Sequence, residues 1–235
     1  MGSPLSELAG SLVVSCQPIP GGPMDRPDIV VAFALAALAG GAKGLRIEGV
    51  ANVKAVRAAT AAPIIGLVKR DLAGVDVRIT ATLNDVAALI DAGADVIAFD
   101  ATARARPVAA AQIAAGIRSA GLVAMADVAT LSEARDAFAF GADVVGTTLS
   151  GYTGGREPDG PDFSLLAATV RLGRPAIAEG RYHAPAQARE AMRLGAFAVV
   201  VGTAITRPER VTHWFADAVA EGRDAARPPF RKAER

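Results

Sequence analysis

The chain has 235 residues, of which 51% are hydrophobic, and its 25 lysines and arginines nearly balance 24 aspartates and glutamates. This length can bury one large α/β core, and a net charge of +1 provides no basic surface for nucleic acid. The single cysteine, Cys16, excludes an internal disulfide and is typical of a reducing compartment. The N-terminus lacks the features of a signal peptide, and the apolar segment 30–40 is too short to cross a bilayer. We therefore expect a cytoplasmic protein without a membrane partner.

Short β-branched segments alternate with alanine- and leucine-rich helical segments along the whole chain. The predicted strands are 11–17, 44–49, 63–69, 95–100, 122–127, 143–148, 175–180 and 198–203. Helices are expected between and after them at 51–60, 83–94, 131–142, 184–196 and 207–220. A Gly-Ala pair precedes three of the strands, at 93–94, 141–142 and 195–196, as expected where a glycine ends a helix before a parallel strand.

Eight strand–helix units in this length predict a single (β/α)8 TIM barrel. We expect the barrel to occupy residues 1–221 and a charged tail to occupy 222–235. A doubly wound open sheet is the alternative fold. However, the first predicted strand is followed by a proline-rich loop, "PIPGGPMDRP", which matches no dinucleotide-binding fingerprint.

Polar residues stand at the carboxyl ends of several predicted strands, where parallel barrels build their active sites. The alternation of side chains along a strand directs Arg46, Lys69, Asp127 and Glu179 into the barrel. Gln17, Lys69, Asp127 and Glu179 follow strands one, three, five and seven, so they form one predicted polar layer at the top of the interior. For any one of them, a structural ion pair is an equally good explanation. A complete polar layer at this end favours a functional site.

The third and seventh strands of an eight-stranded barrel lie opposite each other, so Lys69 and Glu179 are expected to face each other across its mouth. This arrangement suits removal of a proton from one face of a carbon and return of a proton to the other face. Epimerisation next to a carbonyl group is such a reaction. It also needs a group that stabilises the enolate oxygen, and Arg46 is the candidate.

The loops after the seventh and eighth strands are the usual phosphate site of such barrels. Gly180 and Gly202 allow close backbone approach to an anion, and Arg207 adds a guanidinium before Pro208. The alternative is that Gly202 merely ends a strand and Arg207 is an exposed residue at a helix start. The candidate phosphate-binding residues are Gly180, Arg181, Gly202, Thr203 and Arg207. Two histidines and one cysteine are too few for an ordinary metal cluster, so we expect no required metal.

The chain resembles the N-acetylmannosamine-6-phosphate 2-epimerases of bacterial amino-sugar and sialic acid catabolism over nearly its whole length. The resemblance rests on "SCQ", "LRIEG", "PIIGLVKRD", "ITAT", "DATARARP", "MADV", "GTTLSGYT", "AEGR" and "VVVGTAITRPE", in that order. It implies a (β/α)8 enzyme that interconverts N-acetylmannosamine 6-phosphate and N-acetylglucosamine 6-phosphate without a redox cofactor, and it implies a homodimer.

The resemblance also implies roles for individual residues. Lys69 and Glu179 match the proton-transfer pair of the family. The sugar site is implied at Gln17, Arg46 and Asp127, with Thr147 as a further substrate-binding candidate, and the segment 202–207 matches the phosphate end. The protonation state of Lys69 stays open, as does the choice between one and two proton-transferring groups. The charged C-terminal extension has no clear counterpart in the family.

Two other functions remain as alternatives. One is a different phosphate-binding barrel enzyme, such as a synthase or decarboxylase acting on a phosphorylated ribose derivative. The other is a sugar-phosphate-binding regulator that performs no chemistry. An opposed lysine and carboxylate argue against the regulator, because binding alone does not need them.

Overall fold

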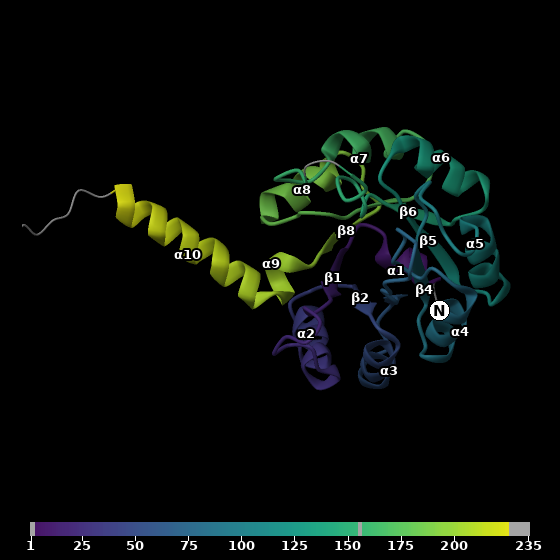
Figure 1. Cartoon of the computed structure of the whole chain (residues 1–235), viewed down its shortest axis with the longest axis horizontal. Coiled ribbons are helices and arrows are strands. Elements are labelled where there is room, and N and C mark those ends of the chain that lie inside the picture. Colours follow the sequence, from purple (N-terminus) through teal and green to yellow (C-terminus); the bar gives the residue numbers. More distant parts are fainter. Residues whose placement is uncertain (1–2, 155–156, 226–235) are drawn as a thin grey trace, which may run out of the picture.

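A computed structural model describes residues 3–154 and 157–225 of the chain. Eight parallel strands form a closed barrel in sequence order, with helices around the outside (Figure 1). This confirms the predicted (β/α)8 barrel. The strands are β1 (Leu12–Cys16), β2 (Gly44–Glu48), β3 (Ile64–Leu67), β4 (Val96–Asp100), β5 (Val123–Asp127), β6 (Val144–Gly146), β7 (Ala176–Ala178) and β8 (Ala198–Val201).

The helices are α1 (Pro4–Leu8), α2 (Pro27–Ala39), α3 (Val50–Ala59), α4 (Leu83–Asp91), α5 (Ala110–Ser119), α6 (Leu131–Ala139), α7 (Phe163–Val170), α8 (Pro185–Arg193), α9 (Thr203–Thr206) and α10 (Pro208–Ala225). Helices occupy all five segments in which the sequence pattern predicts them, as α3, α4, α6, α8 and α10, and the structure adds others. Gly93, Gly141 and Gly195 follow α4, α6 and α8 with φ angles of +88°, +99° and +92°. Glycine adopts this left-handed conformation at little cost, so each one ends its helix and redirects the chain into the next strand.

Strand alternation divides the core into two layers. On the outer side, Leu45 and Ile47 of β2 and Ala124 and Ala126 of β5 pack beneath the helices. On the inner side, apolar residues such as Ile65 fill the barrel interior. The inward position of β2 between Leu45 and Ile47 is therefore Arg46, as predicted.

The short helix α1, which the sequence pattern did not reveal, contributes Leu8 to the inner apolar cluster. Leu8 is fully buried. A Cβ atom at Gly44 would lie only 2.3 Å from Leu8 Cδ2, so a larger residue at position 44 would force Leu8 out of place. The close approach of α1 to β2 therefore requires glycine there.

Helix α10 extends away from the barrel (Figure 1). It continues to Ala225, so the first residues of the predicted tail are helical. The rest of that predicted tail, 226–235, lies outside the described residues. None of the helices that the structure describes combines the length and hydrophobicity needed to cross a bilayer.

Candidate active site

A cavity of about 470 Å³ opens at the carboxyl ends of the strands. It has the size of a small-molecule site. Among the predicted site residues, those that line it are Gln17, Arg46, Lys69, Glu179, Gly180, Arg181, Gly202, Thr203 and Arg207. The remaining two, Asp127 and Thr147, are buried beside the cavity and do not form its wall.

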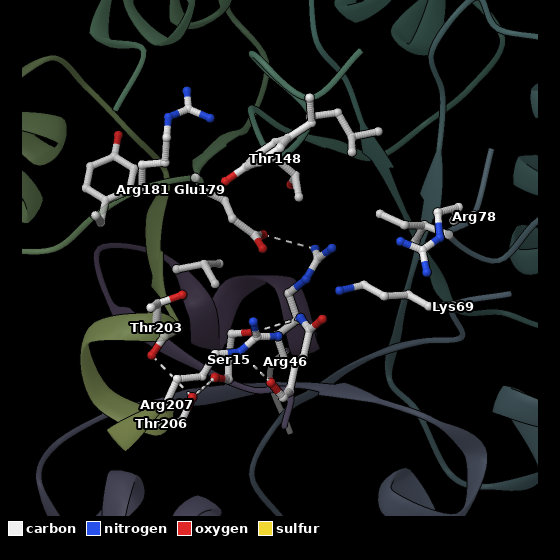
Figure 2. Close-up of a pocket in the computed structure, with 18 of the residues that line it drawn as sticks. Ser15, Arg46, Lys69, Arg78, Thr148, Glu179, Arg181, Thr203, Thr206 and Arg207 are labelled. Atoms are coloured by element: carbon white, nitrogen blue, oxygen red, sulfur yellow. Dashed lines mark hydrogen bonds and ion pairs between the residues drawn. The ribbon is translucent and has the colours of Figure 1, made fainter. Parts of the chain in front are cut away.

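Arg46 is the central charge of the cavity floor (Figure 2). Its Nη1 and Nη2 donate to Asp127 Oδ1 and Oδ2 at 3.2 Å and 2.6 Å, and Nη1 lies 3.0 Å from Glu179 Oε2. Only 1% of the Arg46 side chain is exposed. Burial disfavours the charged guanidinium, but Asp127 and Glu179 outweigh burial and raise the pKa of Arg46. The site therefore holds a permanent positive charge away from bulk water.

Glu179 follows directly after β7, and its backbone is fixed by Thr147. Thr147 Oγ1 donates to the carbonyl oxygen of Glu179 at 2.9 Å and accepts from its N–H at 3.1 Å. Burial raises the pKa of the Glu179 carboxyl to about 7; Arg46 opposes this shift, and the Asp127 carboxylate adds to it. Glu179 can therefore exchange a proton near neutral pH. Thr147 holds the backbone of Glu179 in place and does not contact the carboxyl group through these two bonds.

Lys69 lies two residues beyond the end of β3 and extends into the cavity. Figure 2 shows Lys69 and Glu179 approaching the Arg46 guanidinium from different sides. Burial lowers the pKa of the Lys69 ammonium, and Arg46 and Arg207 strengthen this effect, whereas Glu48 and Glu179 oppose it. A lysine in this state releases its proton more readily than a surface lysine.

Polar groups on the cavity floor are not fully satisfied. Within the described residues, Arg46 Nε and Glu179 Oε2 are buried without a hydrogen-bond partner of good geometry. Such atoms are costly in a folded protein and occur where polar groups are retained for chemistry. The shifted pKa of Glu179 and this cost have one origin, the burial of charge on the cavity floor.

The loops after β7 and β8 form another side of the cavity. Gly180 has a φ of +108°, and Arg207 Nε donates to the carbonyl of Gln17 at 2.9 Å, which joins this side to β1. Arg181 uses Nε and Nη1 to hold the carbonyls of Gly160 and Ser150, at 2.7 Å and 2.6 Å. Arg207 thus adds a positive charge to the cavity wall. The Arg181 guanidinium instead uses two of its nitrogens to stabilise the loops that contain Ser150 and Gly160.

The structure adds cavity residues that the sequence argument did not select. The strongest is Thr148, which lines the cavity and donates to Asp127 Oδ1 at 2.7 Å. Val144 faces inward and Val145 outward, so the alternation rule already predicts that residue 148 faces inward and Thr147 outward. Further polar residues of the cavity wall are Ser15, Arg78, Asp100, Arg104, Tyr152, Tyr182, His183 and Thr206. Ser15 and Asp100 belong to β1 and β4, and their inner neighbours Val13 and Ala98 show that alternation directs both of them inward.

The fold and the charged cavity at the carboxyl ends of its strands are those of a (β/α)8-barrel enzyme. More particularly, the chain belongs to the NanE family, described as putative N-acetylmannosamine-6-phosphate epimerases, whose sequence profile matches residues 30–221. This confirms the resemblance drawn from the sequence motifs.

Individual relatives agree with this family. The chain is 52% identical over 215 residues to a putative N-acetylmannosamine-6-phosphate 2-epimerase of Yersinia pestis, and the match covers 92% of each chain. It is 59% identical over 216 residues to the bifunctional enzyme NanE/NanK of Brucella melitensis; this match covers 92% of the chain but only 42% of that relative's length. The solved N-acetylmannosamine-6-phosphate 2-epimerase of Clostridium perfringens has a TM-score of 0.89 at 38% identity, covering 91% of this chain and 95% of that one.

Proposed function

We propose that the protein is an isomerase that interconverts N-acetylmannosamine 6-phosphate and N-acetylglucosamine 6-phosphate, without a cofactor or a metal. Membership of the NanE family supports the activity and the substrate. The observation that carries the mechanism is the approach of Lys69 and Glu179 to Arg46 from different sides, together with their opposite pKa shifts.

The substrate lies with its phosphate group at the loops after β7 and β8. Arg207 supplies charge there, and Gly180, Gly202 and Thr203 allow the phosphate to approach the backbone. The sugar then extends toward Arg46, which places carbon 2 of the open-chain form between the two proton-transferring groups. Gln17 contacts the sugar from β1, and Arg181 supports the phosphate loop.

The reaction needs one proton to leave carbon 2 and one to return on the opposite face. One of Lys69 and Glu179 removes the proton, the electron pair moves onto the aldehyde oxygen, and the other group donates a proton to carbon 2. Arg46 stabilises the enolate oxygen through its fixed positive charge. After one turnover the group that acted as base is protonated and the group that acted as acid is deprotonated. The two groups therefore exchange roles in the reverse reaction.

Asp127 acts in this scheme through Arg46. Its two carboxylate oxygens hold the guanidinium in place, and Thr148 in turn donates to Asp127. We therefore assign Asp127 to the orientation of Arg46. The sugar contact assigned to Thr147 passes to Thr148, because Thr148 is the threonine that lines the cavity.

Proton NMR in heavy water tests the proposal. With N-acetylmannosamine 6-phosphate, the wild-type protein is expected to form N-acetylglucosamine 6-phosphate that carries deuterium at carbon 2. Folded Lys69→Ala is expected to form no product at a measurable rate. Ligand binding without exchange by the wild type would favour the regulator, and activity only toward another phosphorylated substrate would favour a different barrel enzyme. Near-normal turnover by Lys69→Ala would remove Lys69 from the mechanism.

We also propose that two copies of the chain associate through α10. This helix carries Val211, Phe215 and Val219 at spacings of four residues, and Phe215 and Val219 are 69% and 71% exposed. Helices α2 and α8 lie on the side from which α10 leaves the barrel (Figure 1), and each carries one exposed large apolar side chain, Leu35 on α2 and Met192 on α8. Pairing these apolar faces removes both from water. Light scattering is expected to give a dimer for the wild type and a monomer for Phe215→Asp; a monomeric wild type would refute the proposal.

The site residues all lie between 15 and 207, so we propose that residues 1–221 form the catalytic barrel and that 222–235 are dispensable for chemistry. We propose a cytoplasmic location, which the lone cysteine, Cys16, supports. It is a free thiol buried in β1, and free thiols are typical of proteins in a reducing compartment.

A further inference from the structure

Lys69 is not held by the regular barrel ladder. The register between β3 and β4 pairs Ile65 with Val96 and Gly66 with Ile97, whereas β4 continues to Asp100 against β5. The carboxyl ends of β3 and β4 therefore separate just where the chain reaches Lys69. The Lys69 N–H donates to Glu48 Oε1 on β2 at 3.3 Å, and a second element fixes the lysine from the side of β4.

That element is the segment 78–80, which returns between the two strand ends. Ile79 pairs with Lys69 in an antiparallel bridge, and the Thr80 N–H donates to the Val68 carbonyl at 2.8 Å. On its other edge, the Ile79 carbonyl accepts from the Asp100 N–H at 3.0 Å. The segment thus acts as an inserted strand that connects the Lys69 backbone to the end of β4.

Thr80 is the residue of this segment with the most constrained environment. Only 1% of it is exposed. Its hydroxyl accepts from the Val68 N–H at 3.3 Å and donates to the Ala98 carbonyl at 2.7 Å. One side-chain oxygen therefore joins β3 to β4 where no direct ladder bond does.

The backbone of Thr80 is also strained, with a φ of +44°. A β-branched residue is rarely found in this conformation, and such strain persists only where the surroundings enforce it. A glycine would remove the strain but also the hydroxyl. Threonine at this position is thus strained in its backbone, but its hydroxyl connects Val68 to Ala98.

The residues on either side of Lys69 are also anchored, Val68 through its backbone and Arg70 through its side chain. Val68 is held by Thr80, and Arg70 Nε lies 2.5 Å from Oδ1 of the buried Asp85. Asp85 belongs to the capping box of α4 together with Thr82, so the second anchor of Lys69 also comes from the segment that follows Thr80. The two anchored neighbours fix the backbone position from which the Lys69 side chain extends into the cavity.

We propose that Thr80 is a positioning residue for Lys69, and that its hydroxyl bridge between β3 and β4 directs the lysine amine toward the cavity centre. The inference rests on the role proposed for Lys69 in the reaction. It extends that role to a residue that does not line the cavity and is not expected to touch the substrate.

Two substitutions isolate the hydroxyl. Thr80→Val keeps the β-branched shape but loses the bridge, whereas Thr80→Ser keeps the bridge. We expect Thr80→Val to lower kcat about 10- to 100-fold with little change in KM, because a small misplacement of a reacting group has effects of this size. Thr80→Ser is expected to stay within about threefold of the wild type by the same argument. Thr80→Gly removes the bridge and relieves the positive φ, so it decides the question if Thr80→Val does not fold.

The titration of Lys69 gives a readout that does not depend on turnover. The chain has four lysines, at positions 43, 54, 69 and 232, so lysine labelled with ¹³C at Cε gives few NMR signals, and Lys69→Arg assigns the signal of Lys69. In the wild type its titration midpoint is expected below 10.5. Loss of the bridge is expected to move this midpoint toward 10.5, because the amine leaves its site near Arg46 and Arg207.

Thr169→Val is the matched control. Thr169 is fully buried in α7, and within the described residues its hydroxyl has no hydrogen-bond partner. This control is expected to leave kcat and the Lys69 titration unchanged. The proposal is overturned if Thr80→Val or Thr80→Gly keeps the wild-type titration and kcat, or if Thr80→Ser loses as much as they do. A wild type without epimerase activity but with a Thr80-dependent titration would refute the proposed function and leave the positioning role standing.

Discussion

Replacing Glu179 with glutamine is expected to stabilise the protein at alkaline pH while it destroys activity. Glutamine has nearly the shape of protonated glutamate but cannot ionise. The folded protein holds the pKa of Glu179 at about 7, compared with 4.5 for a free carboxyl. Since one pKa unit corresponds to about 1.4 kcal/mol, ionising Glu179 costs the folded state about 3 kcal/mol.

The sign follows from the raised pKa. Below pH 4.5 Glu179 is protonated in both the folded and the unfolded state, and the free energy of unfolding is at its full value. This free energy falls as the pH rises from there through about 7, because the unfolded state releases the proton of Glu179 more easily than the folded state does. Between pH 5.5 and 8.5, Glu179→Gln should therefore gain about 2 kcal/mol relative to the wild type. For a domain of this size, that gain raises Tm by about 4–8 °C.

The assay is urea unfolding of both proteins at several pH values, with turnover measured in parallel. We expect kcat to fall more than about 100-fold. Glu190→Gln serves as the control, since Glu190 is a surface carboxylate on α8 and its substitution should give a flat difference. A constant difference between the wild type and Glu179→Gln across this pH range would refute the reasoning, because Glu179 would then not resist ionisation.

Three further predictions address the other charges of the site. The pH profile of kcat/KM should be bell-shaped. Its acid limb should lie near pH 7, because the Lys69–Glu179 pair lacks a base below that pH, and its alkaline limb should lie below pH 10.5, because the pair lacks an acid above that limb. A profile that is flat from pH 6 to 9 would contradict the assignment. Asp127→Asn should lower the free energy of unfolding by about 3 kcal/mol in urea titrations, because it leaves the buried Arg46 with less compensation; an unchanged stability would show that Glu179 alone is a sufficient partner. Arg207→Met should raise KM for the phosphorylated sugar about 10- to 100-fold, and isothermal calorimetry with inorganic phosphate should show the same loss; equal affinities would move the phosphate away from this end.

Strand periodicity was enough to predict the barrel and the inward direction of Arg46, Lys69 and Glu179. Alternation and helix-ending glycines are local properties of the chain, so they can be read without knowing which segments meet. The order of the strands follows because β–α units of this length leave neighbouring strands side by side. The motifs then identified the family, and the proposed chemistry follows from residues at strand ends.

Only the tertiary structure decided which hydrogen-bond partners the polar side chains of the site have. Asp127 was expected beside the substrate, but its pairing with Arg46 and Thr148 places it behind the cavity wall. Thr80 stands in the "ITAT" motif without any sign of its bridge, since that bridge depends on how far the ends of β3 and β4 separate. Periodicity predicts which side of its own strand a residue occupies, whereas hydrogen-bond partners depend on distances between segments far apart in the chain.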